Sequence, residues 1–131
     1  MKKTTLLHAQ LSHLIARLGH GDLLVLGDAG LPIPAGTERI DLAVSANLPR
    51  MLAVLDAVLA EMQVEAAVVA EELQGRNPEV AEGLRVRLGA TPVTRVPHEE
   101  LKAMCAGARA VVRTGEFSPY ANVVLRSGVV F

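Results

Sequence analysis

The chain has 131 residues, which is the usual length of one domain, and we expect a single domain over residues 1–131. Half of the residues are hydrophobic but only 2% are aromatic, so the core must be built from aliphatic side chains. A net charge of −1 without any block of like charges argues against nucleic-acid binding, and no segment is long and apolar enough to span a membrane.

The first half of the chain alternates helical and extended patterns. Leucine spacing predicts a helix over residues 6–18 that ends at Gly19. A short continuous apolar run at 22–27 is typical of a strand buried on both faces. The loop AGLPIPAG follows, then a strand at 38–44, and a second helical stripe at 51–62 that begins near Pro49.

The second half continues the alternation. A strand is predicted at 64–70, and a helix that Asn77-Pro78 opens and Gly89 closes. A strand at 92–96, a short helix at 98–107 and a strand at 109–113 follow. The last apolar runs, 123–125 and 129–131, are further strand candidates on either side of Ser127-Gly128.

This order of elements predicts an α/β fold with three layers, α/β/α, in which helices cover both faces of one sheet. The stretch after Arg113 has no room for a crossover helix, so at least one strand there should be antiparallel. We therefore expect a mixed, mostly parallel sheet. The segment LGDAG lacks the spacing GxGxxG, and no P-loop occurs, which excludes the common nucleotide-binding motifs.

His20 and Asp28 flank the first predicted strand. At the usual rise per residue of a β-strand, the two residues would lie roughly 20 Å apart, at opposite ends of that strand. They can share a site only if the turn folds back or if another subunit supplies one of them. The plain alternative is a helix-terminating turn at His20 and a local loop cap at Asp28.

His98 follows Pro97 at the start of a helix, where an imidazole can donate to and accept from a sugar hydroxyl, or serve as a surface cap. The four histidines lack the spacings HxH and HExxH, and Cys105 is the only cysteine. We therefore expect no metal site. A single thiol excludes an intramolecular disulfide and favours a cytoplasmic location.

The stretch RTGEFSPYANVVLRSG gathers Glu116, Ser118, Tyr120 and Asn122 between two apolar strands. Polar groups on a loop that a rigid scaffold holds suit a ligand rich in hydroxyl groups. The alternative is a polar hairpin loop without a ligand.

The two motifs together, HGD-strand-DAGLPIP and RTGEFSPYAN, resemble the D-ribose pyranase family, whose relatives include L-fucose mutarotases. The resemblance runs from Met1 to Phe131. It implies a cytosolic, cofactor-free isomerase that interconverts cyclic forms of free D-ribose on an α/β fold with a mixed sheet. It also implies a homo-oligomer, a decamer of two stacked pentamers, with the pocket near a subunit boundary.

Carried onto this chain, the resemblance makes His20 the proton donor. It assigns sugar binding to Asp28, His98, Tyr120 and Asn122, together with the main chain of Ala121. Lys102 matches a further polar residue near the family site. A mutarotase of another sugar such as L-fucose, or a non-catalytic sugar-binding partner of an uptake system, are the alternative functions.

Three places depart from the family pattern, the first being Leu6-Leu7-His8 instead of Ile-Leu-Asn. Gly27 replaces a bulkier residue before Asp28, and Pro97 stands where a serine often caps the helix of His98. We therefore expect a weaker cap on that helix.

Overall fold

The structure is a computed structural model that describes residues 1–131, and its centre is a six-stranded sheet in the order β2-β5-β1-β6-β3-β4. Each strand overlaps a run that the apolar pattern predicted. The strands are β1 (Leu23–Gly27), β2 (Glu38–Asp41), β3 (Val64–Ala70), β4 (Val93–Val96), β5 (Ala110–Arg113) and β6 (Val123–Ser127).

One strand, β6, runs against the others. It pairs antiparallel with β1 and with β3, while β1 pairs parallel with β5, β5 with β2, and β3 with β4. The expected mixed, mostly parallel sheet is confirmed. Because β6 runs antiparallel to the other five strands, its start lies at the same edge of the sheet as the carboxyl ends of β1 to β5. We call this the carboxyl edge.

The helices begin and end close to the predicted limits. His8 caps the first helix by accepting the Leu11 N–H at 3.2 Å, and the Asn77 side chain accepts the Val80 N–H at 3.3 Å one residue before Pro78. The helices are α1 (Ala9–Arg17), α2 (Met51–Leu59), α3 (Leu73–Arg76), α4 (Pro78–Leu88) and α5 (His98–Met104), which continues as the 3₁₀ turn η1 (Cys105–Gly107).

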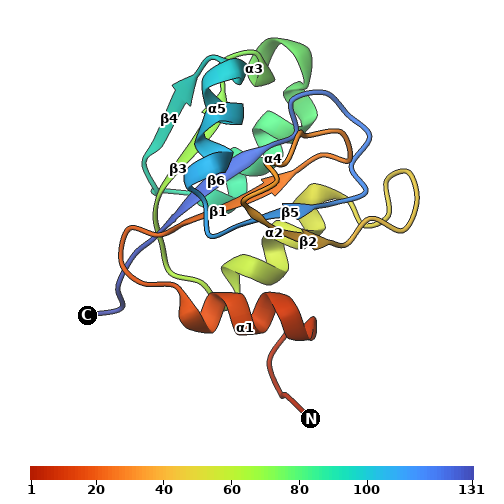
Figure 1. Ribbon diagram of the computed structural model, residues 1–131. Helices are drawn as coiled ribbons and strands as arrows, with labels where there is room; N and C mark the ends of the chain where they lie inside the picture. Colours follow the sequence, from red (N-terminus) through yellow and green to blue (C-terminus); the bar gives the residue numbers. More distant parts are fainter.

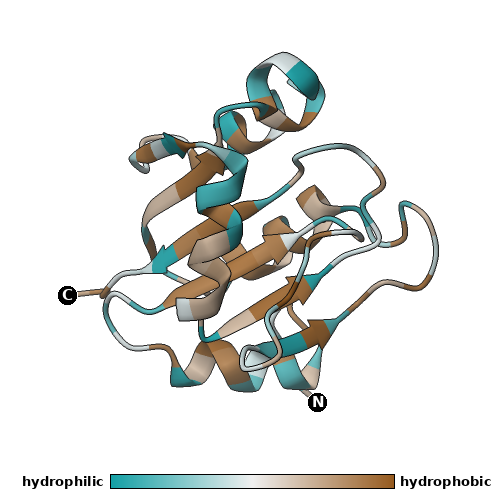
Figure 2. Cartoon of the chain, turned by 45° about the horizontal axis from the view of Figure 1, so that its top comes forward, coloured by the Kyte–Doolittle hydropathy of each residue, from teal (hydrophilic) through white to brown (hydrophobic).

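Helices cover both faces of the sheet, as the three-layer prediction requires (Figure 1). The larger core lies between the sheet and α1, α2 and α4, whereas α5 and the loop at Leu31 cover the other face around Val25 and Val111. Figure 2 shows the central strands as a nearly continuous apolar band with polar residues toward the periphery. No helix has the length and apolar character that a membrane crossing requires.

Two parts of the prediction were wrong. Residues 129–131 form no strand. The last backbone hydrogen bond between the two chain segments is donated by the Gly128 N–H to the Gln63 carbonyl at 2.9 Å, and the residues before Gln63 are not extended, so residues 129–131 have no strand to pair with. Val130 and Phe131 are accordingly exposed. The short helix α3 was not predicted, since four residues are too few to show a helical period.

Candidate functional site at the carboxyl edge

Asp28 and Asn122 meet where β1 ends and β6 begins. The Asn122 carbonyl oxygen accepts the Asp28 backbone N–H at 2.8 Å, and the Asn122 amide donates to Asp28 Oδ2 at 2.9 Å. The other carboxylate oxygen, Oδ1, accepts the Gly30 N–H at 2.9 Å. Asn122 is fully buried while Asp28 is only partly buried, so the carboxylate is held rigidly at the surface of the protein.

The loop after β1 is tied to the strand next to it. The Thr114 hydroxyl donates to the Gly27 carbonyl at 2.8 Å, and Arg113 Nε donates to the Ala29 carbonyl at 3.0 Å. At Gly27 a Cβ would lie 2.6 Å from Leu31 Cδ2, so a bulkier residue there would force Leu31 to move. The small residue before Asp28 thus lets Leu31 close over the end of β1.

His98 and Tyr120 form an aromatic pair beside this group. Their ring centroids lie 5.0 Å apart in a T-shaped arrangement at 88°. Tyr120 has a left-handed backbone with φ of 57°, and its carbonyl accepts the Asn122 N–H at 2.8 Å. His98 Nδ1 is buried and has no hydrogen-bond partner within the protein, which is uncommon for a buried polar atom.

The start of α5 is capped from outside the helix. Pro97 provides no side-chain cap, but the Glu72 carboxylate accepts the His98 backbone N–H at 3.1 and 3.3 Å. Pro97 thus gives no cap of its own, as expected, and Glu72 supplies a negative charge that is favourable at the helix N-terminus. Lys102 pairs with Glu99 at 2.6 Å on the same helix.

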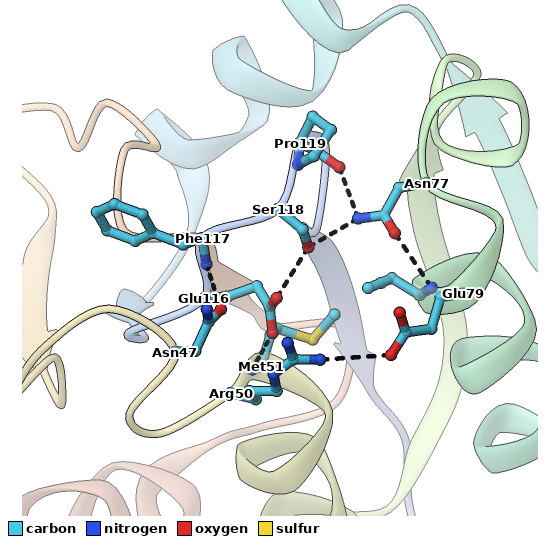
Figure 3. A network of polar contacts seen from close by, with 10 residues as sticks. Asn47, Arg50, Met51, Asn77, Glu79, Glu116, Phe117, Ser118 and Pro119 are labelled. Carbon is cyan, nitrogen blue, oxygen red and sulfur yellow. Dashed lines mark hydrogen bonds and ion pairs between the residues drawn. The ribbon is translucent and has the colours of Figure 1, made fainter.

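The loop that carries Tyr120 and Asn122 is pinned to two helix starts (Figure 3). The buried Glu116 carboxylate accepts the Met51 N–H at 3.0 Å and the Ser118 hydroxyl at 2.8 Å. The Asn77 amide donates to Ser118 Oγ at 2.8 Å and to the Pro119 carbonyl at 2.9 Å. Because β5 and β6 lie on opposite sides of β1, this loop crosses the end of β1, and the hairpin interpretation was wrong.

A cavity of about 360 Å³ opens at this edge beside Arg113, Glu116 and Phe117, and Asp28 is the only predicted sugar-binding residue that lines it. A larger hollow of about 460 Å³ lies between α4 and β4 and contains none of the predicted site residues. Asp28 therefore connects the smaller cavity to the polar cluster, whereas His98, Tyr120 and Asn122 line neither cavity.

His20 lies at the opposite edge of the sheet. Its Nε2 is 2.8 Å from Glu65 Oε2, and its side chain is 60% exposed. The turn does not fold back toward Asp28, and at about 3.3 Å per residue β1 alone separates the two by more than ~13 Å. Within one protomer the structure thus brings Asp28, His98, Tyr120, Ala121 and Asn122 together and leaves His20 apart.

Sequence reasoning missed two acidic residues that contact the candidate histidines: Glu72 accepts the His98 backbone N–H, and Glu65 contacts the His20 ring. Glu72 lies just beyond β3 and reaches His98 across 26 positions, and Glu65 reaches His20 across 45 positions. Neither pair has a local sequence signal, because the contacts exist only once β3 lies beside β4 and β6.

Comparisons with known proteins agree on one family. Residues 1–130 match the RbsD / FucU transport protein family. A D-ribose pyranase of Symbiobacterium thermophilum is 61% identical over the full length of both chains. The structure of Bacillus subtilis RbsD complexed with D-ribose superposes with a TM-score of 0.97 at 40% identity, covering 100% of both chains. A fucose mutarotase of Streptococcus pneumoniae in complex with L-fucose gives 0.82 at 26% identity, covering 95% of this chain and 94% of that one.

Proposed function

Because the chain belongs to the RbsD / FucU transport protein family, we propose that it is a D-ribose pyranase, an isomerase that interconverts the pyranose and furanose forms of free D-ribose. The observation that carries this proposal is the cluster of Asp28, His98, Tyr120 and Asn122 at the carboxyl edge, in a chain similar to D-ribose pyranases along its whole length. The first sequence-based hypothesis and the comparisons agree on this activity.

The reaction is a ring opening followed by a different ring closure. A proton leaves the anomeric hydroxyl and another is delivered to the ring oxygen, while the bond from C1 to the ring oxygen breaks and a free aldehyde forms. A different hydroxyl then attacks C1, releases its proton, and the carbonyl oxygen regains one. No electrons are gained or lost overall. One positioned acid or base typically accelerates such a step by about 10²–10⁴-fold.

We assign the proton transfer to His20 and sugar binding to Asp28, His98, Tyr120, Asn122 and the Ala121 main chain. The unpartnered, buried Nδ1 of His98 supports its role, because a sugar hydroxyl would satisfy it. Asp28 is held by Asn122 and Gly30, and its carboxylate can accept a hydrogen bond from a sugar hydroxyl. Lys102, one helical turn after His98, lies on the same face of α5 and is a further candidate for sugar contact.

We further propose that His20 joins the sugar site of a neighbouring protomer, in a homo-oligomer that we expect to be a decamer. The separation of His20 from Asp28 by the length of β1 supports this, since one protomer alone cannot place both on one sugar. In a ring-shaped oligomer, one surface patch of each protomer contacts a different patch of the next protomer. Such a contact can bring the His20 edge of one protomer to the carboxyl edge of its neighbour. The buried thiol of Cys105 suits the reducing cytoplasm, where we expect the enzyme to work.

Exchange NMR on ribose tests the function directly. The protein should speed exchange between pyranose and furanose signals in proportion to its concentration, and the His20→Ala variant should not. Faster exchange of L-fucose than of D-ribose would favour the mutarotase alternative, which the fold similarity to the fucose enzyme supports. Ribose binding by calorimetry without any faster exchange would instead favour a sugar-binding protein, the alternative that the family's description as transport proteins supports.

A further inference from the structure

The pairing of His20 with Glu65 has a consequence for the proton transfer. We infer that Glu65 is the positioning residue of His20 and that it leaves Nδ1, not Nε2, as the nitrogen that exchanges protons with the sugar. The inference rests on the proposed role of His20. It begins from the 2.8 Å contact between His20 Nε2 and Glu65 Oε2.

The tautomer follows from the chemistry of the two partners. A carboxylate can only accept hydrogen bonds, so Nε2 must carry the proton that points at Glu65. The other carboxylate oxygen, Oε1, accepts Arg126 Nε at 2.9 Å, which fixes the orientation of the Glu65 carboxylate. A neutral ring in this arrangement keeps the Nδ1 lone pair free to take a proton, and the carboxylate then stabilises the imidazolium that forms.

The backbone conformation at Glu65 directs its side chain toward His20. The register of β3 against β6 shifts between Val64, which pairs with Ser127, and Ala66, which pairs with Arg126. Glu65 is therefore the extra residue of a β-bulge, a device that redirects a side chain and is frequent beside functional sites. The next chain segment lies close behind, because a Cβ on Gly128 would come to 3.0 Å from the Glu65 Cβ.

The turn that carries His20 is held just as firmly. Gly21 adopts φ of 83° and donates its N–H to the Ser127 carbonyl at 2.8 Å. Asp22 Oδ2 accepts the Gly19 N–H at 2.8 Å, and its Oδ1 accepts Arg109 Nε at 2.9 Å. The backbone around the histidine is thus fixed on both sides, while the ring itself remains 60% exposed. That exposure leaves Nδ1 accessible to a sugar bound outside this protomer.

The first test reads the His20 ring without any sugar, by ¹⁵N NMR of the imidazole at a pH where the ring is neutral. We expect the Nε2-protonated form in the wild type and a mixture of tautomers in Glu65→Ala. Glu65→Gln has only one side-chain oxygen, which Arg126 needs because arginine can only donate, so its NH2 should face Nε2 and favour the Nδ1-protonated ring. Gln63→Ala, an exposed change two residues earlier on the same segment, is the matched control and should leave the spectrum unchanged. An Nδ1-protonated ring in the wild type, or a tautomer that Glu65→Ala does not alter, would overturn the inference.

The second test measures ribose exchange in the same variants. Glu65→Ala should lower kcat by about ten- to a hundred-fold with KM nearly unchanged, because a hydrogen-bonded carboxylate partner is lost while the sugar-binding residues stay in place. Glu65→Gln should lose at least as much, because its NH2 then faces Nε2 and the lone pair of Nδ1 is no longer free. Wild-type kcat in Glu65→Ala would refute the positioning role. Absence of ribose exchange in the wild type would refute the pyranase function instead, and the NMR result would still decide whether Glu65 sets the ring.

Discussion

Asn122 holds Asp28 through both ends of its amide, although 94 positions separate the two residues. The amide oxygen accepts the Asp28 backbone N–H and the amide nitrogen donates to the Asp28 carboxylate, so neither residue can rotate without breaking a bond. This reciprocal pair joins the end of β1 to the start of β6. The carboxylate that we assign to sugar binding is thereby oriented before any ligand arrives.

Replacing Asn122 with alanine should weaken both the fold and the site. The change leaves the Asp28 N–H without its partner beside a fully buried position, at a cost of about 1–3 kcal/mol in the free energy of unfolding. Ribose binding should weaken in the same variant because the Asp28 carboxylate is no longer held. Urea denaturation and calorimetry measure the two effects. Gln74→Ala, which removes an exposed amide side chain from α3, is the control, and an Asn122→Ala protein as stable as Gln74→Ala would contradict the argument.

The aromatic pair gives a second prediction. His98→Ala removes the buried, unpartnered Nδ1 that we assign to a sugar hydroxyl, so ribose affinity should fall by about 2- to 12-fold, equivalent to ~0.5–1.5 kcal/mol. Tyr120→Phe keeps the ring against His98 and removes only the hydroxyl, which isolates that contribution. His13→Ala, an exposed histidine on α1, should leave the Kd unchanged. Unaltered affinity in both site variants would place the sugar elsewhere.

Sequence patterns located the strands well because each buried strand is a short apolar run between turn residues, as in β1 and β5. They failed at 129–131, where an equally apolar run meets no neighbouring strand, a fact that depends on where β3 begins. Most of the carboxyl-edge cluster was named from the family resemblance. Its supports were not, because Glu72 and Glu65 contact the histidines only through tertiary structure.

Glu116 should matter for stability and for binding together. Its buried carboxylate links the start of α2 to the loop that carries Tyr120 and Asn122, so Glu116→Ala should lower the free energy of unfolding by about 2–3 kcal/mol. The loop should then hold ribose less tightly. Glu100→Ala, at an exposed position in α5, is the control for removing a carboxylate. Stability and Kd equal to those of Glu100→Ala would show that the network in Figure 3 does not position the loop.

The carboxyl group of Asp22, in the turn that carries His20, should make the stability of the protein depend on pH. The Gly19 N–H, and then the Arg109 guanidinium, hold the pKa of Asp22 below its ordinary value of 3.8. A lowered folded-state pKa means that the stabilisation is complete above 3.8 and is lost as pH falls through the lower, folded value. The difference in free energy of unfolding between wild type and Asp22→Asn should therefore be constant near neutral pH and shrink in acid. A difference that grows on acidification would contradict this sign.

The last prediction concerns a site shared between protomers. If His20 of one chain serves the sugar that Asn122 of another chain binds, His20→Ala and Asn122→Ala should each be nearly inactive alone, yet active when co-expressed. In randomly mixed oligomers about one site in four would combine an intact His20 with an intact Asn122 from different chains, so activity should recover to about a quarter of the wild-type value. Light scattering at micromolar concentration must show a large assembly in each preparation. A monomer with full activity, or an assembled mixture without recovery, would mean that His20 and the carboxyl edge of the same chain act together, against the separation that β1 imposes.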